Sequence, residues 1–247
     1  LANEPTRTLL LTGASRGIGH ATVKRFGAAG WRVLTVSRHA FSEDCPWDGG
    51  KDNHIQLDLS DLDSLPDAIA TIREKLPEGR LEAMVNNAAI SPKAPDGGRL
   101  GVLQTDLTAW RQVFAVNFFS VAMLGQGLIE ELTAAKGTIL NVTSIAGARV
   151  HPFAGAAYAT SKAALAALTR EMAAEFGERG VRVNAIAPGE IDTSILSPGT
   201  DELVEREIPM RRLGKPEEVA ATIYFLCSGA ASYVNGAEVH INGGQHV

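Results

Sequence analysis

The stretch Thr8-Leu-Leu-Leu-Thr12-Gly-Ala-Ser-Arg16-Gly-Ile-Gly19 decides the fold of this chain. Residues 8–11 form a short apolar run, typical of a buried strand, and an amphipathic, helix-like stretch follows over 20–29. A strand, a glycine-rich turn and a helix together form a unit that binds dinucleotides. In such a unit Gly13 allows the tight turn, Gly17 lets the backbone approach a pyrophosphate, and Gly19 lets the helix pack closely. The free N–H groups at the helix N-terminus favour phosphate.

The rest of the chain continues this pattern of alternating strands and helices. We predict an α/β fold: a single doubly wound Rossmann-type domain over 1–247, with a mostly parallel seven-stranded sheet and helices on both faces. The predicted strands are 8–11, 32–37, 54–57, 83–86, 137–142, 181–186 and 237–241, and the predicted helices are 17–29, 61–75, 106–134, 156–178, 201–207 and 216–227. Two stretches depart from a plain version of this fold. Pro46, Gly49 and Gly50 predict a shortened crossover over 39–53. Residues 92–104 predict a loop near the mouth of the site, either solvated or in contact with substrate.

Tyr158 and Lys162 stand four residues apart in a segment that favours helix, so they share one helix face. A free tyrosine has a pKa of about 10. A neighbouring ammonium lowers that value, so we expect Lys162 to tune Tyr158 for proton exchange with an alcohol or carbonyl oxygen. Ser144 lies fourteen residues before Tyr158 and could polarise the same oxygen. Taken singly, each of these residues could equally be an ordinary surface or turn residue.

Seven motifs in order make the chain resemble the short-chain dehydrogenase/reductases. They are Thr12-Gly-x-x-x-Gly-Ile-Gly19, Asp58, Asn86-Asn-Ala-Ala89, Asn117, Ser144, Tyr158-x-x-x-Lys162 and Pro188-Gly-x-x-x-Thr193. The segment 212–244 is most similar to the beta-ketoacyl carrier-protein reductase branch. The resemblance implies catalytic roles for Asn117, Ser144, Tyr158 and Lys162, with Asn117 holding a water beside Lys162. The implied cofactor-binding residues are Gly13, Ser15, Arg16, Gly17, Ile18, Gly19, Ser37, Arg38, Asp58, Leu59, Asn87, Ala88, Ala89, Tyr158, Lys162, Pro188, Gly189, Ile191 and Thr193.

The end of the second predicted strand bears on the choice of cofactor. An NAD-preferring site usually places a carboxylate there, where it binds the ribose 2′-OH. This chain has Ser37 and Arg38 instead, with Arg16 in the glycine turn. Two guanidinium groups can hold a 2′-phosphate by charge-assisted hydrogen bonds. We therefore predict NADP(H) in preference to NAD(H), although either arginine could point to water.

The composition limits the partners. A net charge of −5 argues against a nucleic-acid partner, and the apolar runs are too short to predict a membrane span. The two cysteines, Cys45 and Cys227, and the six histidines form no metal-binding spacing, so no metal is predicted. Free thiols are consistent with a reducing cytoplasm.

The substrate is the least determined part. The predicted pocket wall comprises Ser144, Ile145, Val150, Phe153, Glu190 and Ile195. We predict a small ketone or secondary alcohol as substrate. Two alternatives stay open: a 3-oxoacyl thioester on a carrier protein, and a nonenzymatic dinucleotide sensor on the same fold. The acidic residues around Lys136 and Arg179 count against a carrier protein, which should meet a basic rim. The family resemblance implies a homotetramer.

Overall fold

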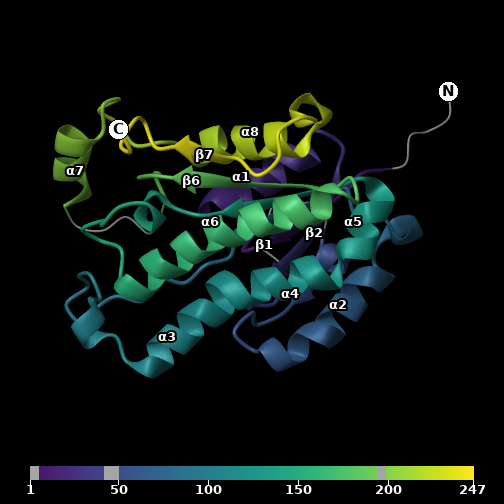
Figure 1. The fold of residues 1–247 in the computed structure, drawn as a ribbon, viewed down its shortest axis with the longest axis horizontal. Helices are drawn as coiled ribbons and strands as arrows, with labels where there is room; N and C mark the ends of the chain where they lie inside the picture. The colour runs from purple at the N-terminus through teal and green to yellow at the C-terminus, as the bar shows by residue number, and fades with distance from the viewer. Residues whose placement is uncertain (1–5, 42–49, 194–198) are drawn as a thin grey trace.

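The protein is built on one seven-stranded parallel sheet (Figure 1). The structure, a computed structural model, describes residues 6–41, 50–193 and 199–247. The strands run in the spatial order β3-β2-β1-β4-β5-β6-β7, and every pairing between them is parallel. Their bounds are β1 Thr8–Thr12, β2 Arg32–Ser37, β3 His54–Gln56, β4 Ala83–Asn86, β5 Thr138–Val142, β6 Arg182–Pro188 and β7 Glu238–Ile241. The predicted fold class is confirmed.

Helices cover both faces of this sheet (Figure 1). On one face α1 packs against α8, and on the other lie α2, α3, α4 and α6. The main helices are α1 Gly17–Gly27, α2 Leu65–Glu74, α3 Leu107–Phe114, α4 Ser120–Gly127, α5 Ile129–Ala135, α6 Ala156–Gly177, α7 Thr200–Glu207 and α8 Pro216–Cys227.

Strand β1 shows how the sequence produces two cores. Leu9 and Leu11 belong to the apolar cluster shared with α1 and α8, whereas Leu10 belongs to the cluster on the opposite face. Successive strand residues point to opposite faces, and all three leucines are fully buried. A strand buried on both faces therefore needs a continuous apolar run, as residues 9–11 provide.

The predicted helix 106–134 is interrupted. A π-helical segment, Ala115–Phe119, separates α3 from α4, and Leu128 leaves helical geometry before α5 begins. By length and composition alone, Leu107–Gly127 could cross a membrane. Its residues Val113 and Leu124 are buried within this fold, which is the behaviour of a core helix. The predicted start of α2 at residue 61 is also corrected, because a 3-10 turn over Leu62–Ser64 precedes it.

The predicted short crossover between β2 and β3 falls partly outside the described residues, which omit 42–49. Its described end is a 3-10 turn, Lys51–Asn53, that leads directly into β3. The predicted strand bounds differ from the observed ones by at most two residues.

Candidate active site

A cleft of about 890 Å³ opens at the carboxyl ends of the strands. The strand order reverses between β1 and β4, and open parallel sheets bind ligands at this switch point. The cleft collects residues from both halves of the chain. Its predicted cofactor-binding members are Gly13, Ser15, Arg16, Gly17, Ile18, Ser37, Arg38, Asp58, Leu59, Asn87, Ala88, Ala89, Tyr158, Lys162, Pro188, Gly189, Ile191 and Thr193. Gly19 does not line the cleft and lies buried behind the turn.

The glycine turn fits a dinucleotide pyrophosphate on its own geometry. Gly13 and Gly17 have positive φ values of 71° and 53°, which favour glycine. A Cβ on Gly13 would lie 2.8 Å from the Ala88 Cα, and a Cβ on Gly19 would meet the Gly13 carbonyl. The positions of Gly13 and Gly19 are therefore packed too tightly for a side chain. The turn leads directly into the N-terminus of α1, where free N–H groups favour phosphate.

The segment after β4 holds this turn in place. The Asn87 side chain donates to the Gly13 carbonyl at 2.8 Å, and the Thr12 hydroxyl accepts from the Asn87 and Ala88 N–H groups, each at 3.1 Å. Two motifs 74 residues apart thus form one rigid element. Thr12 was not predicted as a site residue, although it opens the glycine motif.

The end of β2 lines the end of the cleft that is distant from Ser144 and Tyr158. Arg16 and Arg38 are both exposed there, and Ser37 donates to the His39 carbonyl at 2.9 Å. The Asp58 carboxylate accepts from the Ser60 N–H and hydroxyl, and these bonds, with the charge of Arg38, hold its pKa below the usual value. Asp58 is therefore ionised and oriented by its own turn.

Ser144, Tyr158 and Lys162 meet in the cleft at the end of β5. Ser144 follows β5, and the other two lie on α6, which packs beside it. Lys162 is almost wholly buried, at 2% exposure, and its ammonium donates to the Val142 carbonyl at 2.6 Å. Its Nζ lies 5.7 Å from the centre of the Tyr158 ring. The structure thus brings together three residues that the sequence predicted to act jointly.

The electrostatics differ from the prediction in one respect. Burial raises the pKa of Tyr158, the hydrogen bond with Ser144 opposes that rise, and the charge of Glu190 adds to it. Burial also lowers the pKa of Lys162 to about 7. The net shift of the Tyr158 pKa is therefore upward, opposite to the expected lowering, because removal from water outweighs the hydrogen bond with Ser144.

Asn117 lies behind the cleft, within the π-helical segment. Its side chain accepts from the Ile90 N–H at 2.9 Å and donates to the Ile90 carbonyl and the Ser161 hydroxyl, each at 3.0 Å. These bonds join the end of β4 to α6. Ser161, one residue before Lys162, was missed by sequence reasoning, although its place in the Tyr-Ala-Thr-Ser-Lys motif could have drawn attention to it.

The predicted substrate residues are only partly brought together. Ser144, Ile145, Phe153 and Glu190 line the cleft. Val150 is 78% exposed and does not line the cleft. Its predicted place in the pocket wall is therefore wrong. Ile195 lies outside the described residues.

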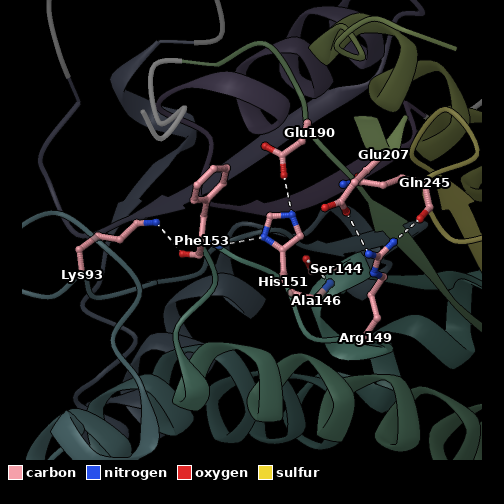
Figure 2. Close-up of polar contacts among 9 residues, drawn as sticks. All are labelled: Lys93, Ser144, Ala146, Arg149, His151, Phe153, Glu190, Glu207 and Gln245. Carbon is pink, nitrogen blue, oxygen red and sulfur yellow. Dashed lines mark hydrogen bonds and ion pairs between the residues drawn. The ribbon is translucent and has the colours of Figure 1, made fainter. Parts of the chain in front are cut away.

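Glu190 contacts His151, a residue that was not predicted as a site residue from the sequence (Figure 2). His151 also lines the cleft.

The loop 92–104 is attached to the cleft at one end. Lys93 donates to the Phe153 carbonyl at 2.7 Å, and Arg99 donates to the Ala154 carbonyl at 2.9 Å. Pro92 and Lys93 line the cleft, whereas Leu103 near the end of the loop is fully exposed. The start of the loop is thus a wall of the site, and its later part faces solvent.

This fold and cleft define a class, the Rossmann-fold oxidoreductases that use a nicotinamide dinucleotide. Residues 13–246 match the family model described as Enoyl-(Acyl carrier protein) reductase. The chain is 57% identical to Protein FixR of Bradyrhizobium diazoefficiens, over 98% of this chain and 87% of that one. A 3-oxoacyl-[acyl-carrier-protein] reductase of Synechocystis is 33% identical, with 95% of each chain covered.

A solved structure agrees with these matches. A short-chain dehydrogenase/reductase family oxidoreductase from Brucella ovis, in complex with a partially ordered NAD, superposes with a TM-score of 0.85 at 58% identity, covering 96% of this chain and 100% of that one. The chain belongs to the short-chain dehydrogenase/reductase family, as the sequence motifs predicted. It is an NAD(P)-dependent oxidoreductase of that family.

Proposed function

We propose that the protein interconverts a small ketone and a secondary alcohol with NADP(H), and that Tyr158 exchanges the proton. The observation that carries the proposal is the convergence of Tyr158 and Ser144 in the same cleft as the glycine turn, with the buried Lys162 beside them. A nonenzymatic sensor would have no need of a buried lysine beside that pair. Keeping Lys162 out of water is unfavourable, so its presence supports catalysis.

The residues divide the chemistry among them. The bound dinucleotide supplies or accepts the hydride. Tyr158 gives its proton to the substrate oxygen during reduction and takes it back during oxidation. The Ser144 hydroxyl donates a hydrogen bond to the same oxygen and orients it. Lys162, held by the Val142 carbonyl, supplies positive charge beneath the tyrosine when it is protonated. Asn117 fixes α6 against β4 and so positions this group.

The choice of NADP(H) rests on charge at the far end of the cleft. Arg16 and Arg38 line it, and the end of β2 offers Ser37 where a carboxylate would favour NAD(H). Both guanidinium groups are exposed and free to turn toward a 2′-phosphate. The Brucella ovis relative has NAD in its structure, which favours the opposite preference. Titration with NADPH and NADH, compared at equal ionic strength, decides between them.

A free small molecule is preferred over a carrier-bound thioester. The relative from Synechocystis is a carrier-protein reductase, and this keeps the thioester as the second candidate. A carrier protein needs a basic rim, yet Arg179 is paired with Glu130 at 2.7 Å on the surface. The positive charge available to an acidic carrier protein is thereby reduced.

A cytoplasmic homotetramer remains our proposal for the location and assembly of the enzyme.

The variant Tyr158→Phe tests this function. Turnover of a responsive ketone should fall by about 100- to 10,000-fold, because the proton donor is lost while the ring stays in place. Fluorescence titration should give an unchanged affinity for the dinucleotide. Turnover equal to that of the wild type would exclude Tyr158 as the proton donor.

A further inference from the structure

His151 and Glu190 form a largely buried polar pair in the wall of the cleft (Figure 2). The imidazole Nε2 lies 2.8 Å from the Glu190 Oε1, and the two side chains are only 7% and 13% exposed. Burying polar groups costs free energy because they lose their contacts with water. A buried polar pair in a cleft wall is therefore a candidate for a functional role.

The hydrogen bond that His151 accepts determines which ring nitrogen carries the proton of the neutral imidazole. The Phe153 N–H donates to the Nδ1 at 3.3 Å, so Nδ1 is an acceptor and the proton of a neutral ring is on Nε2. That Nε2–H is buried beside the Glu190 carboxylate, so it is not open to a ligand and instead orients that carboxylate. The carboxylate of Glu190 keeps the capacity to accept.

The pair lies near the reacting group. Glu190 and His151 line the same cleft as Ser144 and Tyr158. The charge of Glu190 raises the pKa of the Tyr158 hydroxyl, which places the carboxylate within electrostatic reach of the proton donor. A substrate whose oxygen contacts Tyr158 and Ser144 would present its neighbouring atoms to this pair.

The character of the wall limits the substituent. The carboxylate of Glu190 accepts hydrogen bonds, and a hydroxyl group of a substrate can donate one to it. An anionic substituent would be repelled by Glu190. An acyl chain would cover the carboxylate without offering it a hydrogen bond, at a cost comparable to a lost hydrogen bond. Burial lowers the pKa of Lys93, and the charge of Glu190 opposes that change, so the ammonium lies within electrostatic reach of the carboxylate. This neighbouring positive charge offsets the carboxylate and reduces any selection for a cation.

We propose that Glu190, oriented by His151, binds a second hydroxyl of the substrate, so that the enzyme acts on hydroxylated ketones and the corresponding diols or polyols. The inference rests on the proposed function, because it assigns the substrate class of the same site. His151 and Glu190 are then the residues that distinguish a hydroxylated substrate from a plain one. A site built around buried polar groups rejects analogues that lack the matching hydroxyl.

Two ketones of similar size test this. The rate constant kcat/KM is measured for 1-hydroxy-2-butanone and 2-pentanone, with wild type, Glu190→Gln and Glu207→Gln. Glu207 is a matched control, since it pairs with Arg149 at 2.9 Å and does not line the cleft. The wild type should prefer the hydroxy ketone by about 10- to 100-fold. Glu190→Gln should lower kcat/KM for the hydroxy ketone much more than for 2-pentanone, so that most of the preference is lost, and Glu207→Gln should keep the preference.

Each other outcome contradicts a definite claim. Equal turnover of the two ketones by the wild type would overturn the inference and leave the proposed function intact. An equal loss on both ketones in Glu190→Gln would show that the pair only braces the segment 149–154, and would also overturn the inference. Turnover of neither ketone by the wild type, with the dinucleotide tightly bound, would contradict the proposed function along with it.

Discussion

Replacing Lys162 with methionine should stabilise the protein without ligand while it removes activity. Lys162 is 2% exposed, and burial lowers the pKa of its ammonium from 10.5 to about 7. In the unfolded chain the same group keeps its ordinary pKa. At neutral pH the unfolded state therefore binds more protons than the folded state, and this difference favours unfolding. Methionine has a similar length, fills the same space and carries no charge.

The size of the effect follows from the two pKa values. At about pH 7 the folded lysine is half protonated, and the charge costs about 4 kcal/mol of folding free energy. The variant also loses the hydrogen bond to the Val142 carbonyl, which costs about 1–3 kcal/mol in a buried position. We expect a net gain of about 1–3 kcal/mol. For a chain of this size, that gain raises the melting temperature by about 2–10 °C.

The pH dependence of the stability difference between Lys162→Met and wild type separates the effect of the lysine charge from the effect of packing. The cost of Lys162 is full below about pH 7, falls as pH rises, and disappears above about pH 10.5. The stability advantage of Lys162→Met over wild type should thus shrink by about 2 kcal/mol between about pH 7 and pH 9. Urea unfolding without dinucleotide measures this, with the exposed Lys24→Met as control. A variant that is less stable at both pH values, or an advantage that does not change with pH, would refute the reasoning.

Three further predictions concern the cofactor and the assembly. Arg38→Asp should weaken NADPH binding by about 10- to 100-fold and shift preference toward NADH, since it replaces a cation with the carboxylate typical of NAD sites; an unchanged ratio in competitive titration would place 2′-phosphate recognition elsewhere. Gly19→Ala should abolish dinucleotide binding by fluorescence, because its Cβ would meet the Gly13 carbonyl and displace the turn; wild-type affinity would show that the turn can yield. Light scattering should give the mass of a tetramer, and a monomeric mass would exclude that assembly.

The fold was predictable because it rests on local patterns. Residues 8–11 are apolar without alternation, and a helix-length amphipathic stretch and a second apolar run follow. These periodicities predict strand and helix from a few neighbouring residues each. The interruption at Ala115–Phe119 could not be predicted this way, because a π-helical segment differs from an α-helix only in hydrogen-bond register. There the side chain of Asn117 is held by Ile90, a residue distant in sequence.

The sequence by itself determined the parallel sheet, through the alternation of strand and helix patterns along the chain. It also determined the glycine turn and the placing of Tyr158 beside Lys162, since each of these depends on spacing within one short segment. Only the tertiary structure decided the electrostatics and the wall of the cleft. The pKa of Lys162 depends on burial by several elements, and Val150 and His151 differ in exposure although they are adjacent. The contact of His151 with Glu190 joins residues 39 positions apart, in the segments that follow β5 and β6. Burial and long-range contact arise only when the chain is folded, so no local pattern encodes them.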